Sequence, residues 1–218
     1  MNVLELFAGS CSFTKTAWEL NKAKIEMGLW NADFYNTFTT DYKQNPDNSI
    51  DFVVDIFDFK YKDLPSIDII WASPPCTFFS VSSIGHHWNK DHTPKTKEAE
   101  YGMAIVEKTI EIIDYLGPQF FFIENPRGKL RKLDIMKDIP RKTVTYCQYG
   151  ENRMKPTDIW TNLDWEPKPM CKNGDSCHES APRGSRTGTQ GMKNAYEKSK
   201  VPYELCKELL LLSHKSLI

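Results

Sequence analysis

Apolar residues follow two patterns along the chain, and each pattern predicts one kind of element. Short runs of apolar or β-branched residues predict strands, and longer segments with an apolar residue at every third or fourth position predict helices. The expected strands are NVLELF (2–7), TFTTD (37–41), IDFVVD (50–55), DIIWAS (68–73), QFFFIEN (119–125), KTVTYC (142–147) and TDIWTN (157–162). The expected helices are 13–28, 95–116 and 202–212.

The two longer helices each show an apolar stripe that should face a core. In the first helix the stripe comprises Phe13, Ala17, Trp18 and Ile25. In the second it comprises Tyr101, Ala104, Ile105, Ile112 and Tyr115, and the Gly117-Pro118 step should end the helix.

Strands that are apolar throughout and alternate with helices indicate a parallel sheet covered on both faces. The expected fold class is therefore α/β, with a doubly wound and mostly parallel sheet. Residues 163–193 interrupt this pattern, because they are rich in Gly, Pro, Ser, Lys and Arg and show no period. We therefore divide the chain into a core (1–162), an irregular insertion (163–193) and a C-terminal helix that returns to the core (194–218).

Composition narrows the class of protein. Hydrophobic residues make up 40% and charged residues 26% of the 218 residues, as in globular proteins. No apolar run reaches the length of a membrane span, and the N-terminus lacks the features of a secretory signal. The six cysteines do not suggest a disulfide framework in a chain of this length, so we expect reduced thiols and a cytoplasmic protein.

Charge is distributed unevenly between the two halves of the chain. The formal net charge is −1, but residues 1–125 carry 10 Lys and Arg against 18 Asp and Glu, whereas residues 126–218 carry 18 against 11. The first part is therefore acidic, with a net charge of −8, and the second basic, with +7. Such asymmetry hints at a basic face for a polyanion. A lopsided solvated surface is the alternative.

Polar residues with chemical potential follow the expected strands at their carboxyl ends. These are Gly9 in FAGSCS, Asp41, Asp55, Cys76 in SPPC and Glu124 in ENP. In an open parallel sheet, ligands bind at that edge. The sequence therefore predicts a site that combines small residues, acids and a thiol.

The turn after the first strand has one glycine, Gly9, with Ser10 and Ser12 beside it. A dinucleotide-binding turn has three glycines, so a cofactor without phosphates fits better. Asp41 is placed to bind a ribose diol, and Asp55 to accept a hydrogen bond from an adenine amine. An adenosine that carries a sulfonium would use both acids. Alternatively, each acid caps a helix or a turn.

Cys76 and Glu124 are the candidate catalytic groups. The Pro74-Pro75 step before Cys76 is stiff, and a helical turn after it would lower the pKa of the thiol. A buried structural role is the alternative, and it suits Cys147 and Cys206 better. Glu124 follows four apolar residues, so burial should raise its pKa and keep it protonated. The alternative is a carboxylate paired with Arg127 or Arg131.

Five segments together resemble the core motifs of DNA (cytosine-5) methyltransferases, in particular the short enzymes of bacteriophages. They are LELFAGSCSF, SPPCTFFS, FIENPRGKL, YGENRMKPTDIWTN and SKVPYEL, in the family's order. The resemblance implies a Rossmann-like class I methyltransferase core, S-adenosyl-methionine as cofactor, DNA as partner and a bacterial host cell. The sequence departs from the family pattern in three motifs: Glu151 and Lys155 replace Gln and Arg, Pro126 replaces valine, and Ser10-Cys11-Ser12 stands where two glycines are common.

The resemblance also implies a role for individual residues. Cys76 is the nucleophile that adds to C6 of a flipped cytosine, Glu124 protonates N3, and Arg153 touches the target base. The implied cofactor-binding residues are Phe7, Ala8, Gly9, Ser10, Cys11, Ser12, Asp41, Asp55, Ile56, Pro75 and Ser199. The implied DNA-binding residues are Ser80, Arg127, Lys155, Arg183, Arg186 and Gln190. The last three lie in a loop that could equally be a plain surface segment.

Three other functions stay open at this point. They are methylation of RNA at cytosine C5, methylation of an exocyclic amine (N4 or N6) in DNA, and DNA binding without catalysis. A zinc site at CKNGDSCH (171–178) is not expected, because the spacing is C-x5-C-H and the sequence nearby offers no fourth ligand. We therefore predict no metal. Because no apolar run is long enough to span a membrane, we also predict no membrane partner.

Overall fold

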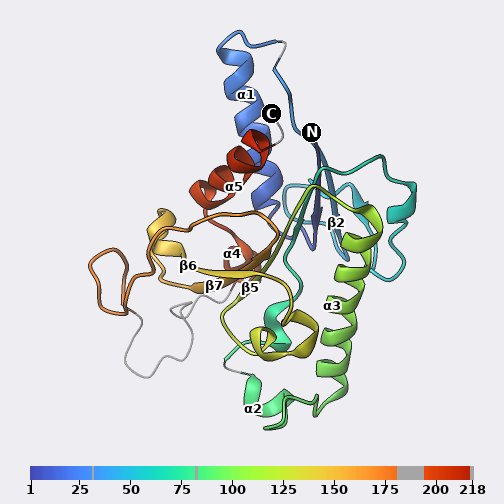
Figure 1. Ribbon diagram of the computed structural model, residues 1–218, viewed down its shortest axis with the longest axis vertical. Coiled ribbons are helices and arrows are strands. Elements are labelled where there is room, and N and C mark those ends of the chain that lie inside the picture. The colour runs from blue at the N-terminus through green and yellow to red at the C-terminus, as the bar shows by residue number, and fades with distance from the viewer. Residues whose placement is uncertain (31, 82, 181–193, 217–218) are drawn as a thin grey trace.

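A central mixed sheet organises the fold in the computed structural model, which describes residues 1–218 except 31, 82, 181–193 and 217–218 (Figure 1). Its strands are β1 (Asn2–Leu6), β2 (Asn36–Asp41), β3 (Phe52–Val53), β4 (Ile69–Ala72), β5 (Phe120–Pro126), β6 (Arg141–Thr145) and β7 (Pro156–Thr161). Within the described residues, these seven strands are ordered β3-β2-β1-β4-β5-β7-β6.

Strands β1 to β5 run parallel, and β7 runs antiparallel to both β5 and β6. The central strand β4 pairs with β1 from Val3↔Ile69 to Leu6↔Ala72, and all four of its residues are buried. A strand buried on both faces must be apolar at every position, which is the pattern that the sequence shows. The expected α/β class with a mostly parallel sheet is confirmed.

Helices cover both faces of the sheet, which confirms the doubly wound arrangement. The α-helices of the described residues are α1 (Ser12–Glu26), α2 (Ile84–His87), α3 (Lys97–Leu116), α4 (Ala195–Ser199) and α5 (Tyr203–Lys215). Helices α1 and α5 lie on one face and α3 on the other (Figure 1). The alternation along β1 separates the two cores, because Val3 packs on the α1 and α5 side and Leu4 on the α3 side. On the first side, the Phe13 ring stacks on Trp71 with centroids 4.8 Å apart.

The ends of α3 follow from its capping residues. The Thr96 side chain accepts a hydrogen bond from Ala99 N, so the helix begins two residues after the expected Lys95. Gly117 adopts φ 54° and ends the helix as expected.

The predicted apolar stripes were wrong at several positions. In α3, Tyr101 and Tyr115 are 46% and 57% exposed, and the buried face comprises Ala99, Gly102, Ile105, Val106, Thr109, Ile112 and Ile113. In α1, Trp18 and Ile25 are 43% and 42% exposed. The prediction treated tyrosine as an apolar residue, but a tyrosine ring can lie at the border of a buried face. Tyr115 does so, because its ring packs edge-on against Tyr61 with ring centroids 5.4 Å apart.

Two other expected elements are shorter than predicted. The segment IDFVVD forms only the two-residue edge strand β3, whose residues are both exposed. Strand β6 ends at Thr145, and Tyr146 and Cys147 belong to a 3-10 turn, η5 (Tyr146–Tyr149). The described residues of the insertion, 163–180, contain no helix or strand. Nor does any helix among the described residues have the length and apolar character to span a membrane.

Candidate active site

A cavity of about 910 Å³ lies at the carboxyl ends of β1, β2, β4 and β5. A smaller cavity of about 280 Å³ adjoins it, and the two share Phe7, Asp41, Tyr42 and Pro75. The predicted cofactor-binding residues that line the larger cavity are Phe7, Ala8, Gly9, Ser10, Ser12, Asp41, Pro75 and Ser199. Asp55 and Ile56 line the smaller one.

The turn after β1 has a strained backbone. Phe7, Gly9 and Cys11 have φ of 56°, 40° and 52°, in the left-handed region. Non-glycine residues there cost about 1–3 kcal/mol each and cluster at functional sites. The Asp41 carboxylate at the end of β2 accepts a hydrogen bond from Gly9 N at 2.9 Å and so ties this turn to the sheet. Burial raises the pKa of Asp41, and hydrogen bonds from backbone N–H groups oppose that rise.

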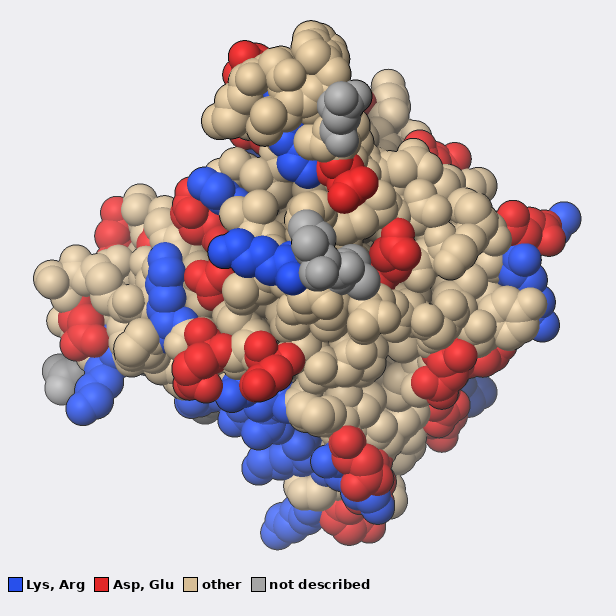
Figure 2. Space-filling view, turned by 45° about the horizontal axis from the view of Figure 1, so that its top comes forward, with Lys and Arg blue, Asp and Glu red and all other residues tan. Residues whose placement is uncertain are grey.

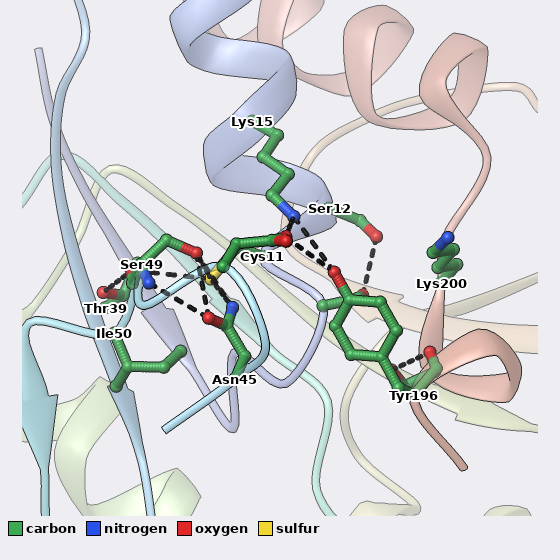
Figure 3. A network of polar contacts seen from close by, with 12 residues as sticks. Cys11, Ser12, Lys15, Thr39, Asn45, Ser49, Ile50, Tyr196 and Lys200 are labelled. Atoms are coloured by element: carbon green, nitrogen blue, oxygen red, sulfur yellow. Dashed lines mark hydrogen bonds and ion pairs between the residues drawn. The ribbon is translucent and has the colours of Figure 1, made fainter. Parts of the chain in front are cut away.

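Cys11 lines neither cavity, although we predicted it among the cofactor-binding residues. Its side chain is fully buried, and its sulfur accepts a hydrogen bond from Asn45 Nδ2 at 3.4 Å and donates one to Ser49 O at 3.7 Å (Figure 3). Burial raises the pKa of this thiol to about 12. Because residue 11 adopts a left-handed conformation, its side chain turns away from the cavity and packs against the loop after β2.

The C-terminal segment closes the larger cavity against α1. Tyr196 OH accepts a hydrogen bond from Lys15 Nζ at 3.2 Å, and Ser12 Oγ accepts one from Val201 N at 3.0 Å (Figure 3). From this segment we predicted only Ser199; Asn194, Tyr196, Lys198 and Val201 also line the cavity. No local sequence pattern pointed to these four residues, because they reach the site only when the chain returns after the insertion.

Cys76 begins the 3-10 turn η2 (Cys76–Phe78) at the end of β4, and its side chain is exposed to the larger cavity. Protein nevertheless surrounds the sulfur on most sides. This desolvation is the main reason why the pKa of the thiol is raised, and the Glu124 carboxylate raises it further, while Lys155 and Lys198 lower it. The expected lowering by the helical turn is therefore outweighed, because one short turn is a weaker influence than desolvation beside a carboxylate.

Glu124 lies on β5, is 5% exposed and lines the same cavity as Cys76. Tyr146 OH donates a hydrogen bond to its Oε1 at 2.9 Å. The next residue, Asn125, donates from Nδ2 to Pro74 O at 2.9 Å and so fastens the end of β5 to the turn before Cys76. Neighbouring strands β4 and β5 therefore present the thiol and the carboxyl to one space.

The alternative pairing of Glu124 with an arginine is absent from the contacts of the described residues. Arg131 binds Asp158 instead, with Nε to Oδ2 at 2.8 Å and Nη2 to Oδ1 at 2.5 Å. Asp158 is fully buried on β7, so this ion pair fixes η3 (Leu130–Lys132) to the antiparallel part of the sheet. Arg127 is exposed.

The residues predicted to contact the nucleic acid are divided between the cavity and its surroundings. Ser80 and Lys155 line the larger cavity. Arg153 does not line it; the residue is 8% exposed and its Nε donates to Glu151 Oε2 at 2.6 Å. Arg127 lies outside the cavity, and Arg183, Arg186 and Gln190 lie outside the described residues.

Lys155 lines the same cavity as the Cys76 thiol and the Glu124 carboxyl. Its backbone has φ 27°, and its Nζ donates to Lys198 O at 3.0 Å and lies 4.5 Å from the centre of the Tyr146 ring. The same tyrosine donates to Glu124, so Lys155, Tyr146 and Glu124 form one connected group.

On the face in Figure 2, blue Lys and Arg side chains gather toward the lower part, while acidic side chains are scattered more widely.

Comparisons with known proteins identify the family of the chain. Residues 1–139 match the family model described as C-5 cytosine-specific DNA methylase. A protein of Frog virus 3 (isolate Goorha), described as a "probable DNA (cytosine-5)-methyltransferase", is 29% identical over 185 residues, which cover 81% of this chain and 78% of that protein.

Two similar solved structures share low sequence identity with the chain. One, from E. coli, is described as a DNA modification methyltransferase encoded within a prophage (TM-score 0.47, 15% identity, 74% of this chain and 46% of that chain). The other is the Entamoeba histolytica methyltransferase EhMeth (TM-score 0.49, 14% identity, 74% and 52%). The chain thus spans about half the length of these two structures.

Proposed function

The chain belongs to the C-5 cytosine-specific DNA methylase family, and from this premise we propose that it transfers a methyl group from S-adenosyl-methionine to C5 of cytosine in DNA. The observation that carries the proposal is that Cys76 and Glu124, from adjacent parallel strands, line one cavity. A methyltransferase that acts on an exocyclic amine needs no thiol at this place, because the amine attacks the methyl group directly.

The donor groups around both cavities suit an adenosine that carries a sulfonium. In the smaller cavity the Asp55 carboxylate can accept a hydrogen bond from the adenine amine, and Ile56 and Phe78 offer apolar contact. Asp41 lines both cavities, so its carboxylate can accept hydrogen bonds from ribose hydroxyls there. When bound, S-adenosyl-methionine supplies the electrophilic methyl group.

Cys76 and Glu124 together can make C5 nucleophilic. The Cys76 thiolate forms a bond to C6, the C5=C6 electron pair moves to C4=C5, and N3 gains the C4=N3 pair together with the proton of Glu124. After C5 has gained its methyl group, a solvent water molecule takes the C5 proton, and the electron pair of that C–H bond re-forms C5=C6 as the C6–S bond breaks. N3 returns its proton to Glu124, which restores the ring. The thiol is therefore a true catalyst, released unchanged.

The target base has to leave the helix stack to meet Cys76, because a stacked base is out of reach of a thiol inside a cavity. Ser80 and Lys155, which line the cavity with Cys76, are the residues we assign to contact with the extruded nucleotide. Lysines and arginines of the basic part of the chain, residues 126–218, would bind phosphates.

Product analysis tests this proposal. The purified protein is incubated with duplex DNA and methyl-labelled S-adenosyl-methionine, and the DNA is digested to nucleosides and separated by mass spectrometry. We expect label in 5-methyldeoxycytidine, and none with the Cys76→Ser variant. A calorimetric titration serves as the control, because Cys76→Ser should still bind the cofactor. Label in N4-methyldeoxycytidine or N6-methyldeoxyadenosine, or transfer to RNA alone, would contradict the proposal.

A further inference from the structure

Four side chains with metal-binding atoms converge next to η5, away from the large cavity. They are Cys147 on that turn and Cys171, Cys177 and His178 in the irregular stretch 163–180. Their three sulfurs and one imidazole nitrogen all lie within 4.8 Å of one another. None of the four residues lines the 910 Å³ cavity, so the methyl-transfer chemistry does not account for them.

We propose that these residues form a structural zinc site of the Cys3His type. A tetrahedral zinc ion with ordinary bond lengths holds its sulfurs about 3.8 Å apart and its sulfurs about 3.6 Å from the nitrogen. The distances between Cys147 Sγ and Cys177 Sγ (3.7 Å), Cys171 Sγ and His178 Nδ1 (3.7 Å), and Cys177 Sγ and His178 Nδ1 (3.5 Å) match those values closely.

The remaining measured pair is closer than a tetrahedral edge. Cys147 Sγ and Cys171 Sγ lie 3.0 Å apart, and they would separate by about 0.8 Å around an ion. This distance is also well beyond the S–S bond length of about 2.05 Å. All six cysteines of the chain are free thiols, so the cluster is not explained by a disulfide.

The surroundings of the cluster suit a closed site. Cys147 and Cys171 are 8% and 7% exposed. Gln148 Nε2 donates to Cys177 Sγ at 3.4 Å, and Thr145 Oγ1 accepts from Cys171 N at 3.1 Å. Such contacts orient ligands and stabilise thiolate in metal sites. Four protein ligands leave no open coordination position, which is the mark of a structural zinc ion rather than a catalytic one.

Hydrogen bonding alone does not explain why the His178 ring is held in this position. Its Nδ1 faces the two sulfurs, while its Nε2 is buried with no partner among the described residues. An ion at Nδ1 would give the ring an anchor. Three soft sulfurs and one imidazole nitrogen within 4.8 Å of one another favour zinc over calcium or magnesium, which bind to oxygen ligands.

The ion would fasten a stretch that has little structure of its own. Residues 163–180 contain no helix or strand, and Glu179 N donates to Asn152 O at 2.9 Å, in the loop that carries Arg153. Zinc would thus fix this stretch to the core next to that loop. Small irregular segments that cannot bury an apolar core commonly depend on a metal in this way.

The fourth ligand is what the sequence concealed. CKNGDSCH offers three ligands in eight residues, and Cys147 lies 24 residues before Cys171. We predicted no metal because the spacing is C-x5-C-H and the sequence nearby offers no fourth ligand, and we assigned Cys147 to a buried strand. The fold ends that strand at Thr145, so the thiol two residues later is free to face the insertion.

Metal analysis of the full-length protein tests the proposal without reference to its activity. We expect one zinc ion per chain, by plasma mass spectrometry, after purification under reducing conditions. Cys171→Ser and Cys177→Ser should lose the zinc. The control variant Cys76→Ser, which has the same substitution at a thiol in the 910 Å³ cavity, should keep it. Replacement with cobalt should give the visible absorption of tetrahedral Co²⁺ bound to thiolates, and limited proteolysis within 163–180 should speed up about 10-fold after chelation.

A fully reduced wild-type protein that takes up neither zinc nor cobalt would overturn the proposal, and so would zinc retained by both Cys171→Ser and Cys177→Ser. The proposal would also be overturned if the purified protein contained a Cys147–Cys171 disulfide and the protein still bound no zinc after that disulfide had been reduced. The wild-type measurements decide the matter even if one variant does not fold. The outcome is independent of whether the protein methylates DNA.

Discussion

Replacement of Gly128 by alanine is expected to disturb the turn that holds the thiol. A Cβ added at Gly128 would lie 2.2 Å from the carbonyl oxygen of Phe79, and real Cβ contacts essentially never fall below 3.0 Å. Phe79 directly follows the turn that Cys76 begins, is 1% exposed, and its carbonyl accepts a hydrogen bond from Lys129 N at 2.7 Å. Because backbone meets backbone here, no side chain can rotate to make room.

The size of the effect follows from the distance to be made up. The two segments must separate by about 0.8 Å or more, and a misplacement of about 1 Å at a catalytic group can cost about 100-fold in rate. The strain of the extra methyl group destabilises the fold by about 1–3 kcal/mol. At about 2–4 °C per kcal/mol for a chain of this size, the melting temperature should fall by about 2–12 °C, so the variant should remain folded at 25 °C.

The assay compares methyl transfer to duplex DNA, thermal unfolding and cofactor affinity. We expect Gly128→Ala to lose about 100-fold in methyl-transfer rate and to bind S-adenosyl-methionine nearly as well as the wild type. The acids assigned to the cofactor belong to other segments, since Asp41 ends β2 and Asp55 follows β3. Gly85→Ala is the matched control, since a Cβ at Gly85 meets nothing within 4 Å. A Gly128→Ala protein with wild-type rate and melting temperature would refute the claim that this close approach positions Cys76.

Three further predictions test the groups around the thiol and the cofactor turn. Without DNA, alkylation of Cys76 by iodoacetamide should have a pH midpoint above that of a free cysteine measured alongside, and Glu124→Gln should lower it, since desolvation and then Glu124 raise the pKa of the thiol; a midpoint below free cysteine would contradict this. Tyr146→Phe removes the hydrogen bond to Glu124, so it should destabilise the fold by about 1–2 kcal/mol and lower the methyl-transfer rate about 10-fold, and urea unfolding with unchanged stability and rate would disagree. Burial raises the pKa of Glu5 to about 7, so the folded state keeps a proton that the unfolded state loses above about 4.5; the wild type should therefore lose about 3 kcal/mol relative to Glu5→Gln between pH 4.5 and 7.5, and an unfolding difference independent of pH would contradict this.

The sheet and the meeting of Cys76 with Glu124, the proposed catalytic pair, could be predicted because their signals are local. Both β4 and β5 contain a continuous apolar run. Glu124 follows the run in β5, and Cys76 comes four residues after β4, so the parallel arrangement alone brings both residues to one edge. The same reasoning placed Asp41 and Asp55 beside the two cavities. No long-range information is needed for features of this kind.

Features that depend on conformation or on distant segments were missed. Counting glycines in FAGSCS overlooked that Phe7 and Cys11 also adopt left-handed backbone, which is why Cys11 turns away from the cavity. Tyr196 reaches the cavity through tertiary contacts with Lys15 of α1 and with Asp47. The pKa of Cys76 depends on how much protein surrounds the sulfur, and no sequence pattern reports that.

Covalent trapping tests the central claim most directly. Duplex DNA that contains 5-fluorocytosine in place of cytosine is incubated with the protein and S-adenosyl-methionine and analysed on a denaturing gel. Fluorine at C5 cannot leave as a proton does, so the Cys76–C6 bond should persist after methyl transfer. We predict a stable protein–DNA adduct that requires the cofactor, maps to Cys76 by peptide mass spectrometry and is absent with Cys76→Ser. An adduct that survives Cys76→Ser, or transfer to cytosine C5 without any adduct, would contradict the account.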